Sequence, residues 1–291
     1  MKPAELIQQI NEIHGTAFTL VERYEQGEQG AFAIVDPDER RYVLKWQPRL
    51  GLMSRLQYAR TVTDRLRTRG YPAPEYIWIG RIPGGIYSIQ TVLPGSPVLL
   101  PVTDAQLSHL IALNELQIDQ APPGLRDWPR EVVHTVLFGE REYCVHTSLQ
   151  QHSSETAEML QELKNIALQY KDEITRKNDI VHFDYNPANI LVHNQEVSGI
   201  IDWDGGCAGD AAFDLATLLF YIYDDVALRE RLWRYALGRT SLDVLSVYLA
   251  HMILRQVDWS LRYHDQATSD RYIARGQEIL REIARRRRDN E

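Results

Sequence analysis

The sequence predicts an α+β protein with a strand-rich beginning and a helix-rich remainder. Residues 18–92 hold short β-prone segments separated by turn residues, whereas from residue 103 onward apolar residues recur at helical spacing. The composition changes between these two parts at Leu93-Pro94-Gly95, which indicates a short hinge. We therefore expect two domains, an N-terminal lobe over residues 1–93 and a mostly helical C-terminal lobe over residues 94–291.

The first lobe is expected to contain a five-stranded antiparallel sheet and one helix. The glycine-bearing segment 27–30 and the turn signal Asp36-Pro37-Asp38 separate the first three strands. The helix is expected from about Ser54, as its N-cap, to Arg69, with Gly70 as its stop signal. The expected strands cover residues 18–24, 31–35, 41–46, 76–81 and 86–92.

Helical periodicity dominates the second lobe. One interruption is expected, a β-hairpin over residues 190–192 and 197–201 that turns at His193-Asn194. No internal repeat is visible, and no heptad pattern indicates an assembly, so the oligomeric state stays open. The expected helices cover residues 103–118, 155–176, 211–223, 242–263 and 271–287.

The overall composition is that of a globular protein. Among 291 residues, 44% are apolar and 25% are charged, which excludes a disordered chain. Cys144 and Cys207 are too few for a disulfide framework or a four-ligand zinc site, which fits a reducing cytosol. The N-terminus has no apolar segment typical of a signal peptide, and the most apolar stretch, residues 211–223, is too short to cross a bilayer. A soluble, cytoplasmic protein without a membrane partner is expected.

The charges are distributed unevenly. Residues 1–100 hold 12 Lys and Arg against 10 Asp and Glu, and residues 101–291 hold 20 against 30. An acidic second part repels nucleic acid and suits a cationic substrate, although solubility alone explains it equally well. The basic run Arg285–Arg288 is expected to be a solvated helix end, favoured by the helix dipole, and not a nucleic-acid site.

The most informative residues form two short motifs. The first is His182-x-Asp184-x-x-x-x-Asn189, and the second is Asp202-Trp203-Asp204 after a predicted hairpin. Phosphoryl transfer needs a carboxylate that orients the acceptor hydroxyl and takes its proton, together with ligands for the metal that neutralises the phosphates. Protein kinases use the same order of residues, a catalytic-loop Asp, an Asn five residues later and a second Asp after a hairpin. Turn and cap roles for Asp184 and Asn189 are the alternative.

These motifs resemble the signature of the aminoglycoside phosphotransferase and choline kinase-like family, which has a protein-kinase-like bilobal fold. The segment Gly209–Ala216 is also similar to the family. The resemblance implies that Asp184 is the catalytic base and that Asn189 and Asp202 bind Mg²⁺. It also implies that ATP or GTP is the phosphate donor and that Lys45, on the third strand, binds its α- and β-phosphates. A surface lysine on an edge strand is the alternative for Lys45.

Other nucleotide-binding candidates lie in the first lobe. The glycine-bearing segment 27–30 is neither a Walker loop nor a protein-kinase glycine loop, and a hairpin turn explains it equally well. If it covers the phosphates, the backbone N–H groups of Gln29, Gly30 and Ala31 are the donors. Gln90 and Val92, on the strand that leads to the hinge, are further candidates.

One feature departs from the kinase pattern. The helix over residues 55–69 has no Glu to pair with Lys45, and its Asp64 and Gln57 fall outside the predicted inward face. The partner of Lys45 is therefore left open, with Asp202 as a candidate. The predicted inward face consists of Leu56, Ala59, Thr63 and Leu66.

We therefore expect an O-phosphotransferase that acts on a small, cationic hydroxyl compound such as an aminoglycoside-type antibiotic, which would confer antibiotic resistance. The alternatives are a kinase of choline, homoserine, fructosamine or a macrolide, a protein kinase, and an inactive nucleotide-binding pseudokinase. The absence of an Ala-Pro-Glu segment after Asp202 disfavours a protein kinase. We also expect Asp214 to brace the loop that carries Asp184, and His182 to hydrogen-bond its backbone. For Asp204, a structural role and a role at the metal or substrate stay open.

Overall fold

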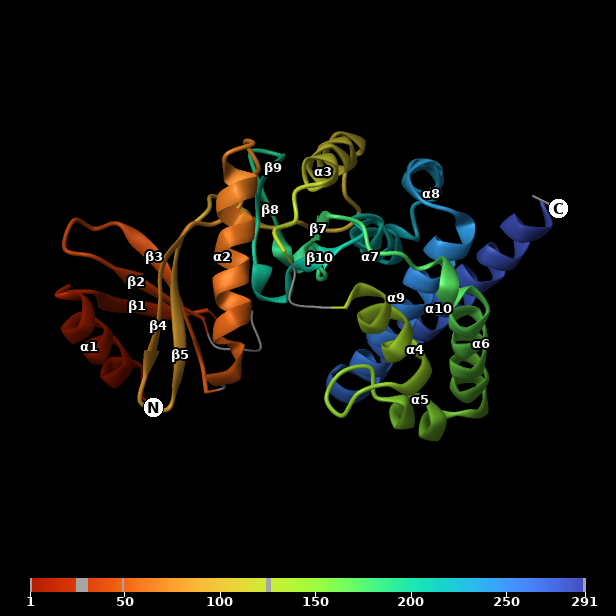
Figure 1. The fold of residues 1–291 in the computed structure, drawn as a ribbon, viewed down its shortest axis with the longest axis horizontal. Coiled ribbons are helices and arrows are strands. Elements are labelled where there is room, and N and C mark those ends of the chain that lie inside the picture. Colours follow the sequence, from red (N-terminus) through yellow and green to blue (C-terminus); the bar gives the residue numbers. More distant parts are fainter. Residues whose placement is uncertain (1, 25–30, 49, 124–126, 290–291) are drawn as a thin grey trace. The chain divides into compact units, whose positions relative to one another are not determined.

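The computed structural model describes residues 2–24, 31–48, 50–123 and 127–289 (Figure 1). It consists of two compact units. The first comprises Met1–Val98 and Ala188–Gly206, and the second comprises Leu99–Pro187 and Cys207–Glu291. The first unit thus includes the segment that carries Asn189 and Asp202. The functional division of the chain at residues 93 and 94 stays a prediction.

The first unit is built on the five-stranded antiparallel sheet that the sequence predicts. The strands lie in the order β1-β2-β3-β5-β4, so that β3 is central and β1 and β4 are the edges. A smaller sheet in the same unit has the order β6-β8-β9. The strands are β1 (Thr19–Arg23), β2 (Ala31–Val35), β3 (Arg41–Gln47), β4 (Tyr76–Ile82), β5 (Gly85–Thr91), β6 (Ser96–Pro97), β8 (Ile190–His193) and β9 (Glu196–Ile200).

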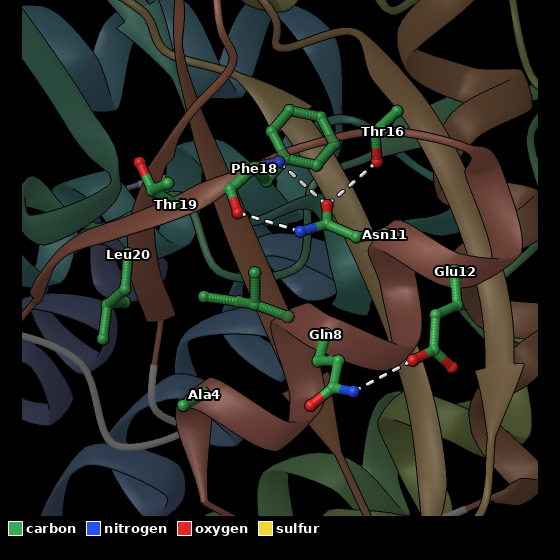
Figure 2. A pocket seen from close by; sticks show the side chains of 9 residues that line it. Ala4, Gln8, Asn11, Glu12, Thr16, Phe18, Thr19 and Leu20 are labelled. Atoms are coloured by element: carbon green, nitrogen blue, oxygen red, sulfur yellow. Dashed lines mark hydrogen bonds between the residues drawn. The ribbon is translucent and has the colours of Figure 1, made fainter.

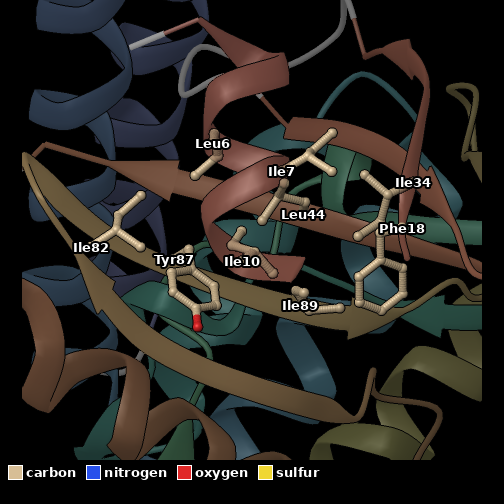
Figure 3. Packing of buried hydrophobic residues seen from close by; sticks show 9 residues of the cluster. All are labelled: Leu6, Ile7, Ile10, Phe18, Ile34, Leu44, Ile82, Tyr87 and Ile89. Atoms are coloured by element: carbon tan, nitrogen blue, oxygen red, sulfur yellow. The ribbon is translucent and has the colours of Figure 1, made fainter. Parts of the chain in front are cut away.

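Two helices cover opposite faces of the five-stranded sheet, although the sequence analysis expected one. The unexpected helix is α1 (Pro3–His14), which ends at Gly15 in the left-handed conformation, with φ at 63°. Its apolar side packs on the sheet and closes a hydrophobic core (Figure 3). The buried residues of this core are Leu6, Ile7, Ile10, Phe18, Ile34, Leu44, Ile82, Tyr87 and Ile89.

The expected helix is α2 (Met53–Arg67), on the other face of the sheet. Its N-cap is Leu52, so the prediction of Ser54 as the cap was wrong. A 3₁₀ turn over Leu50–Leu52 runs directly into the helix, which places Ser54 inside the first turn. The predicted inward face is confirmed, because all four of its residues are buried: Leu56, Ala59, Thr63 and Leu66.

Strand β3 places an apolar side chain on one face of the sheet and a charged side chain on the other. Leu44 is fully buried in the core under α1, and because side chains alternate along a strand, Lys45 lies on the opposite face. In the register of the sheet, Lys45 lies between Ala31 of β2 and Ser88 of β5. Lys45 therefore belongs to a central strand, which contradicts the alternative of a surface lysine at a sheet edge.

The second unit is largely helical, as predicted. The long helix α9 packs against at least six other α-helices of this unit, and a two-stranded sheet pairs β7 (Asp179–Val181) with β10 (Cys207–Gly209). The sequence analysis did not name α4, α5 or α8, nor a short π-helix over Arg130–His134. The α-helices are α3 (Asp104–Leu116), α4 (Thr135–Phe138), α5 (His146–His152), α6 (Ser154–Tyr170), α7 (Ala212–Ile222), α8 (Val226–Arg239), α9 (Leu242–Tyr263) and α10 (Gln266–Arg288).

The basic end of α10 is packed, and not simply solvated as predicted. The guanidinium of Arg286 lies 4.7 Å from the ring centroid of Trp233, and that of Arg287 lies 4.0 Å from the ring centroid of Tyr170. Arg286 is also ion-paired with Glu230 and with Glu282. These contacts tie α10 to α8 and α6.

None of the helices in the described ranges has both the length and the apolar run that a bilayer span requires.

Candidate active site

Lys45 forms an ion pair inside the first unit. Its Nζ lies 2.7 Å from Oδ1 of Asp202 and 3.8 Å from Oδ2 of Asp204, and its side chain is 19% exposed. Burial alone would lower the pKa of the ammonium group, but the charges of Asp202 and Asp204 outweigh it and raise the pKa above its ordinary value. The partner that the sequence left open is therefore Asp202, with Asp204 close by.

Trp203 fixes the position of the two carboxylates. Asp202 has a φ of 66°, a left-handed conformation that turns the chain after β9. The indole of Trp203 is fully buried, donates from Nε1 to the carbonyl of Ile200 at 2.9 Å, and meets the ring of Tyr71 edge to face. A large buried side chain thus anchors the segment between the two aspartates.

Asp204 is held by two strands of the sheet. The hydroxyl of Tyr76 donates to Oδ1 at 2.9 Å, and Nε2 of Gln47 lies 3.4 Å from Oδ2. Burial and the charge of Asp204 raise the pKa of Tyr76 well above its ordinary value, so Tyr76 stays a donor. These contacts hold Asp204 beside Lys45, and its role at a metal or substrate stays a prediction. The carboxylate of α2, Asp64, is ion-paired with arginines of its own helix.

Asn189 and Asp202 flank the same end of the β8–β9 hairpin. Asn189 is 8% exposed, and its carbonyl accepts the N–H of Ile201 at 2.9 Å. The two side chains offer amide and carboxylate oxygens, which suit Mg²⁺. The described ranges contain no group of three or more His, Cys, Asp or Glu that could hold a metal.

The other nucleotide-binding candidates are spread along the sheet. Ala31 begins β2 opposite Lys45, and Gln29 and Gly30 lie outside the described residues. Gln90 is buried on β5 and donates to Oγ of Ser88 at 3.0 Å, whereas Val92 is 40% exposed just beyond the strand. Their roles stay predictions.

Asp214 braces the loop of Asp184 in the second unit, as expected. It is fully buried in α7, and its carboxylate accepts the backbone N–H groups of His182 and Phe183 at 2.8 and 2.9 Å. Nε2 of Gln117 donates to the same carboxylate at 2.8 Å. Burial raises the pKa of Asp214, while His182 and these hydrogen bonds oppose the rise. The expectation for His182 is also confirmed, because its Nδ1 accepts the N–H of Asp184 at 3.2 Å.

The carboxylate of Asp184 has an arginine partner that the sequence analysis missed. Its Oδ1 accepts Nη2 of Arg255 at 2.7 Å and Nδ2 of Asn186, also at 2.7 Å. The side chain of Asp184 is 28% exposed. Arg255 lies on α9, 71 residues away in the sequence, and no local pattern distinguishes it from the other arginines of the helical region.

Replacing Asp214 with Asn is expected to lower the free energy of unfolding by about 3 kcal/mol, because an amide cannot accept from all three donors. Urea denaturation followed by circular dichroism measures this. Asp104→Asn is the control, because Asp104 is 75% exposed in its ion pair with Arg231 and its loss should cost less than about 1 kcal/mol. Equal losses in the two variants would contradict the bracing role.

A pocket of about 500 Å³ lies elsewhere in the first unit (Figure 2). It is formed by α1 and the start of β1, on the face of the sheet opposite to Lys45. The amide of Asn11 is used within the fold, because it pairs with the backbone of Phe18 and accepts the hydroxyl of Thr16. None of the predicted site residues within the described ranges lines this pocket.

Solved structures of several phosphotransferases have a similar fold. Aminoglycoside phosphotransferase APH(4)-Ia is 20% identical, with 96% of this chain and 99% of that chain covered, at a TM-score of 0.70. A variant of it, 21% identical, was solved as a ternary complex with ADP and hygromycin B (94% and 97% covered, TM-score 0.69). Choline kinase LicA from Streptococcus pneumoniae is 13% identical (96% and 99% covered, TM-score 0.66).

The family of the chain follows from its sequence match. Among curated proteins none matches the chain. The model of the phosphotransferase enzyme family (APH) matches residues 21–247, which is most of the chain. The predicted enzyme class, a kinase that phosphorylates a hydroxyl group, is thereby confirmed. The chain belongs to the phosphotransferase enzyme family.

Proposed function

We propose that this enzyme transfers the γ-phosphate of ATP or GTP to a hydroxyl group of a small molecule. The observation that carries the proposal is the 2.7 Å ion pair between Lys45 and Asp202 on a central strand. A nucleoside triphosphate needs a cation for its α- and β-phosphates and a carboxylate for the metal that neutralises their charge. Lys45 and Asp202 supply these two groups side by side.

The remaining residues of the first unit are assigned on the same basis. Asn189 and Asp202 would hold Mg²⁺, which neutralises the charge of the phosphates when it is bound. Lys45 would exchange its contact with Asp202 for phosphate oxygens, while Asp204 stays fixed by Tyr76 and Gln47. Backbone N–H groups of Gln29, Gly30 and Ala31 would cover the phosphates. Gln90 and Val92 would lie along the rest of the nucleotide.

Asp184 is proposed as the base. The acceptor oxygen forms a bond to the γ-phosphorus, the bond from this phosphorus to the nucleoside diphosphate breaks, and the hydroxyl proton passes to a carboxylate oxygen of Asp184. The proton then leaves to solvent, which is accessible because the Asp184 side chain is 28% exposed. We assign the reaction to the cytoplasm, where both nucleotides are abundant.

The acceptor is proposed to be cationic, with an amino sugar of the aminoglycoside type as the first candidate. Residues 101–291 carry an excess of about ten acidic residues, which would attract such a compound. A second candidate is an acceptor with no net charge, such as homoserine. It is favoured by the arginine partners of Asp184, Asp224 and Asp258, which reduce the negative charge that these residues offer.

The test is a panel of acceptors offered to the purified chain with Mg·ATP and Mg·GTP in parallel. Amino sugars, choline and other amino alcohols, and macrolides are scanned for phosphorylated product by mass spectrometry. Lys45→Met is expected to lower kcat/KM for the nucleotide by about 100-fold. Calorimetry of Mg·ATP binding separates the outcomes. Binding without any product would favour a nucleotide-binding module, and no binding at all would overturn the proposal.

A further inference from the structure

One arginine of α9 holds two consecutive residues of the loop that carries the proposed base. Nη1 of Arg255 donates to the carbonyl of Phe183 at 2.7 Å, and Nη2 donates to Oδ1 of Asp184 at 2.7 Å. The guanidinium is planar and its N–H groups point in fixed directions, so two such bonds define the orientation of both acceptors. A lysine ammonium is a point charge and cannot impose this geometry.

The surroundings keep this guanidinium charged and in place. The side chain of Arg255 is 17% exposed, and its guanidinium carbon lies 5.5 Å from the ring centroid of Tyr143 and 5.9 Å from that of Phe183. Burial would lower the pKa of Arg255, but the charge of Asp184 outweighs it and raises the pKa. Arg255 is therefore a permanent, largely desolvated cation with Asp184 as its counter-charge.

The loop depends on contacts of this kind because its backbone is unusual. Phe183 has a φ of 72°, a left-handed value that a phenylalanine rarely adopts. Asp214 accepts the N–H of Phe183 and Arg255 donates to its carbonyl, so the peptide groups on both sides of Phe183 are held. Asp214 and Arg255 differ in the part of the loop that they bind. The hydrogen bonds of Asp214 reach the loop's backbone, whereas Arg255 also binds the side chain of Asp184.

We propose that Arg255 is a positioning residue that sets the direction of the Asp184 carboxylate toward the acceptor hydroxyl. The inference rests on the proposed function, in which Asp184 takes the proton of that hydroxyl. A carboxylate that shares its charge with an arginine suits this reaction, because the transition state of phosphoryl transfer is loose. Such a reaction requires accurate placement of the groups more than a strong base.

The kinetic test compares three variants. Arg255→Met removes both hydrogen bonds and keeps much of the side-chain volume, and Arg255→Lys keeps the charge without the planar fork. Arg262→Met is the matched control. Arg262 lies two turns further along α9, is 21% exposed, and is ion-paired with the buried Asp258 at 2.6 Å. Its loss removes a similar pair away from the loop of Asp184.

Arg255→Met is expected to lower kcat by about 100-fold, since small misplacements of a reacting group have effects of this size. KM for Mg·ATP should change by less than about threefold, because Phe183 and Asp184, the two residues that accept from Arg255, are not among the residues proposed to bind the nucleotide. Guanidinium chloride at millimolar concentration should recover part of the activity of Arg255→Met, and Arg255→Lys should fall between wild type and Arg255→Met. Arg262→Met should keep the wild-type kcat. A wild-type kcat in Arg255→Met, or the same kcat as in Arg262→Met, would overturn the proposal.

A second arm does not depend on turnover. In crystal structures of the wild type and Arg255→Met, the carboxylate of Asp184 is expected to change its rotamer while Asp214 keeps the backbone of His182 and Phe183 in place. An unchanged rotamer would overturn the inference. Asp184→Asn tests the assignment of Asp184 as the base separately from the positioning role of Arg255. Full turnover by this variant would overturn the base assignment itself, whereas an inactive Asp184→Asn beside a fully active Arg255→Met would overturn the positioning role alone.

Discussion

Replacing Asp184 with Asn is expected to lower kcat by about a thousandfold, the middle of the range for loss of a positioned acid or base. The amide has nearly the same shape, but it cannot accept a proton at neutral pH. Calorimetry should find Mg·ATP binding unchanged within a few-fold, because Lys45, Asn189 and Asp202 remain. The loss should therefore fall on kcat, measured as the initial rate at saturating nucleotide and acceptor.

Asp258→Asn is the control for this substitution. Asp258 is also an aspartate paired with an arginine of α9, and it is more deeply buried than Asp184. It accepts the N–H of Val145 and the hydroxyl of Ser148, so its replacement should lower stability without changing kcat. A kcat for Asp184→Asn within tenfold of the wild type would show that another group takes the proton.

The second large effect concerns stability in acid and depends on His251. This histidine is fully buried in α9, among the rings of Tyr143, Phe183 and Phe213. In the described part of the chain neither of its ring nitrogens has a hydrogen-bond partner. Burial, with the charge of Arg255 as the second cause, lowers the pKa of His251 from 6.5 to about 3.

The direction of the pH effect follows from these two values. Below its ordinary pKa the histidine takes up a proton in the unfolded chain, while in the folded chain it stays neutral down to about pH 3. Stability is therefore greatest above pH 6.5 and falls as the pH drops, by about 2 kcal/mol between pH 7.5 and 5 and on the order of 5 kcal/mol by pH 3.

His251→Phe should remove this dependence and raise the free energy of unfolding at pH 7.5 by about 1–3 kcal/mol, because the buried ring nitrogens are eliminated. Urea denaturation at pH 7.5, 6 and 5 measures both effects. His109→Phe, at an exposed position of α3, is the control and should leave the slope with pH unchanged. A wild-type slope in His251→Phe would mean that other groups cause the acid sensitivity.

The sequence predicted the elements whose signals are local. The five strands, α2 and the helices α3, α6, α7, α9 and α10 were found from alternation and helical spacing. The helix α1 was missed although Leu6, Ile7 and Ile10 have the right spacing and Pro3 marks its start. The helix α8 was missed in the same way, despite the cap formed by Asp225. Both helices therefore carry local signals in the sequence, the apolar spacing of α1 and the N-cap of α8.

The contacts between distant residues in the candidate site could not be predicted from local sequence patterns. The placement of Lys45 on a strand followed from the alternation of residues 41–46, and Asp202 was a candidate partner because α2 has no Glu. Their ion pair itself joins residues far apart in the sequence, as does the pair between Arg255 and Asp184. A charged residue on a long helix has no local feature that reveals which distant carboxylate it will meet. Such pairings follow from the tertiary fold, and the structure was needed to find them.

The anchored indole of Trp203 also limits how this enzyme can be regulated. The ring of Trp203 is fully buried and its N–H is bound to the carbonyl of Ile200. Displacing the ring would leave a large cavity and would cost about 3–5 kcal/mol of folding free energy. Any movement of Asp202 that displaces this ring would carry the same cost. An inhibitor that binds by expelling the ring of Trp203 would have to supply this free energy from its own contacts.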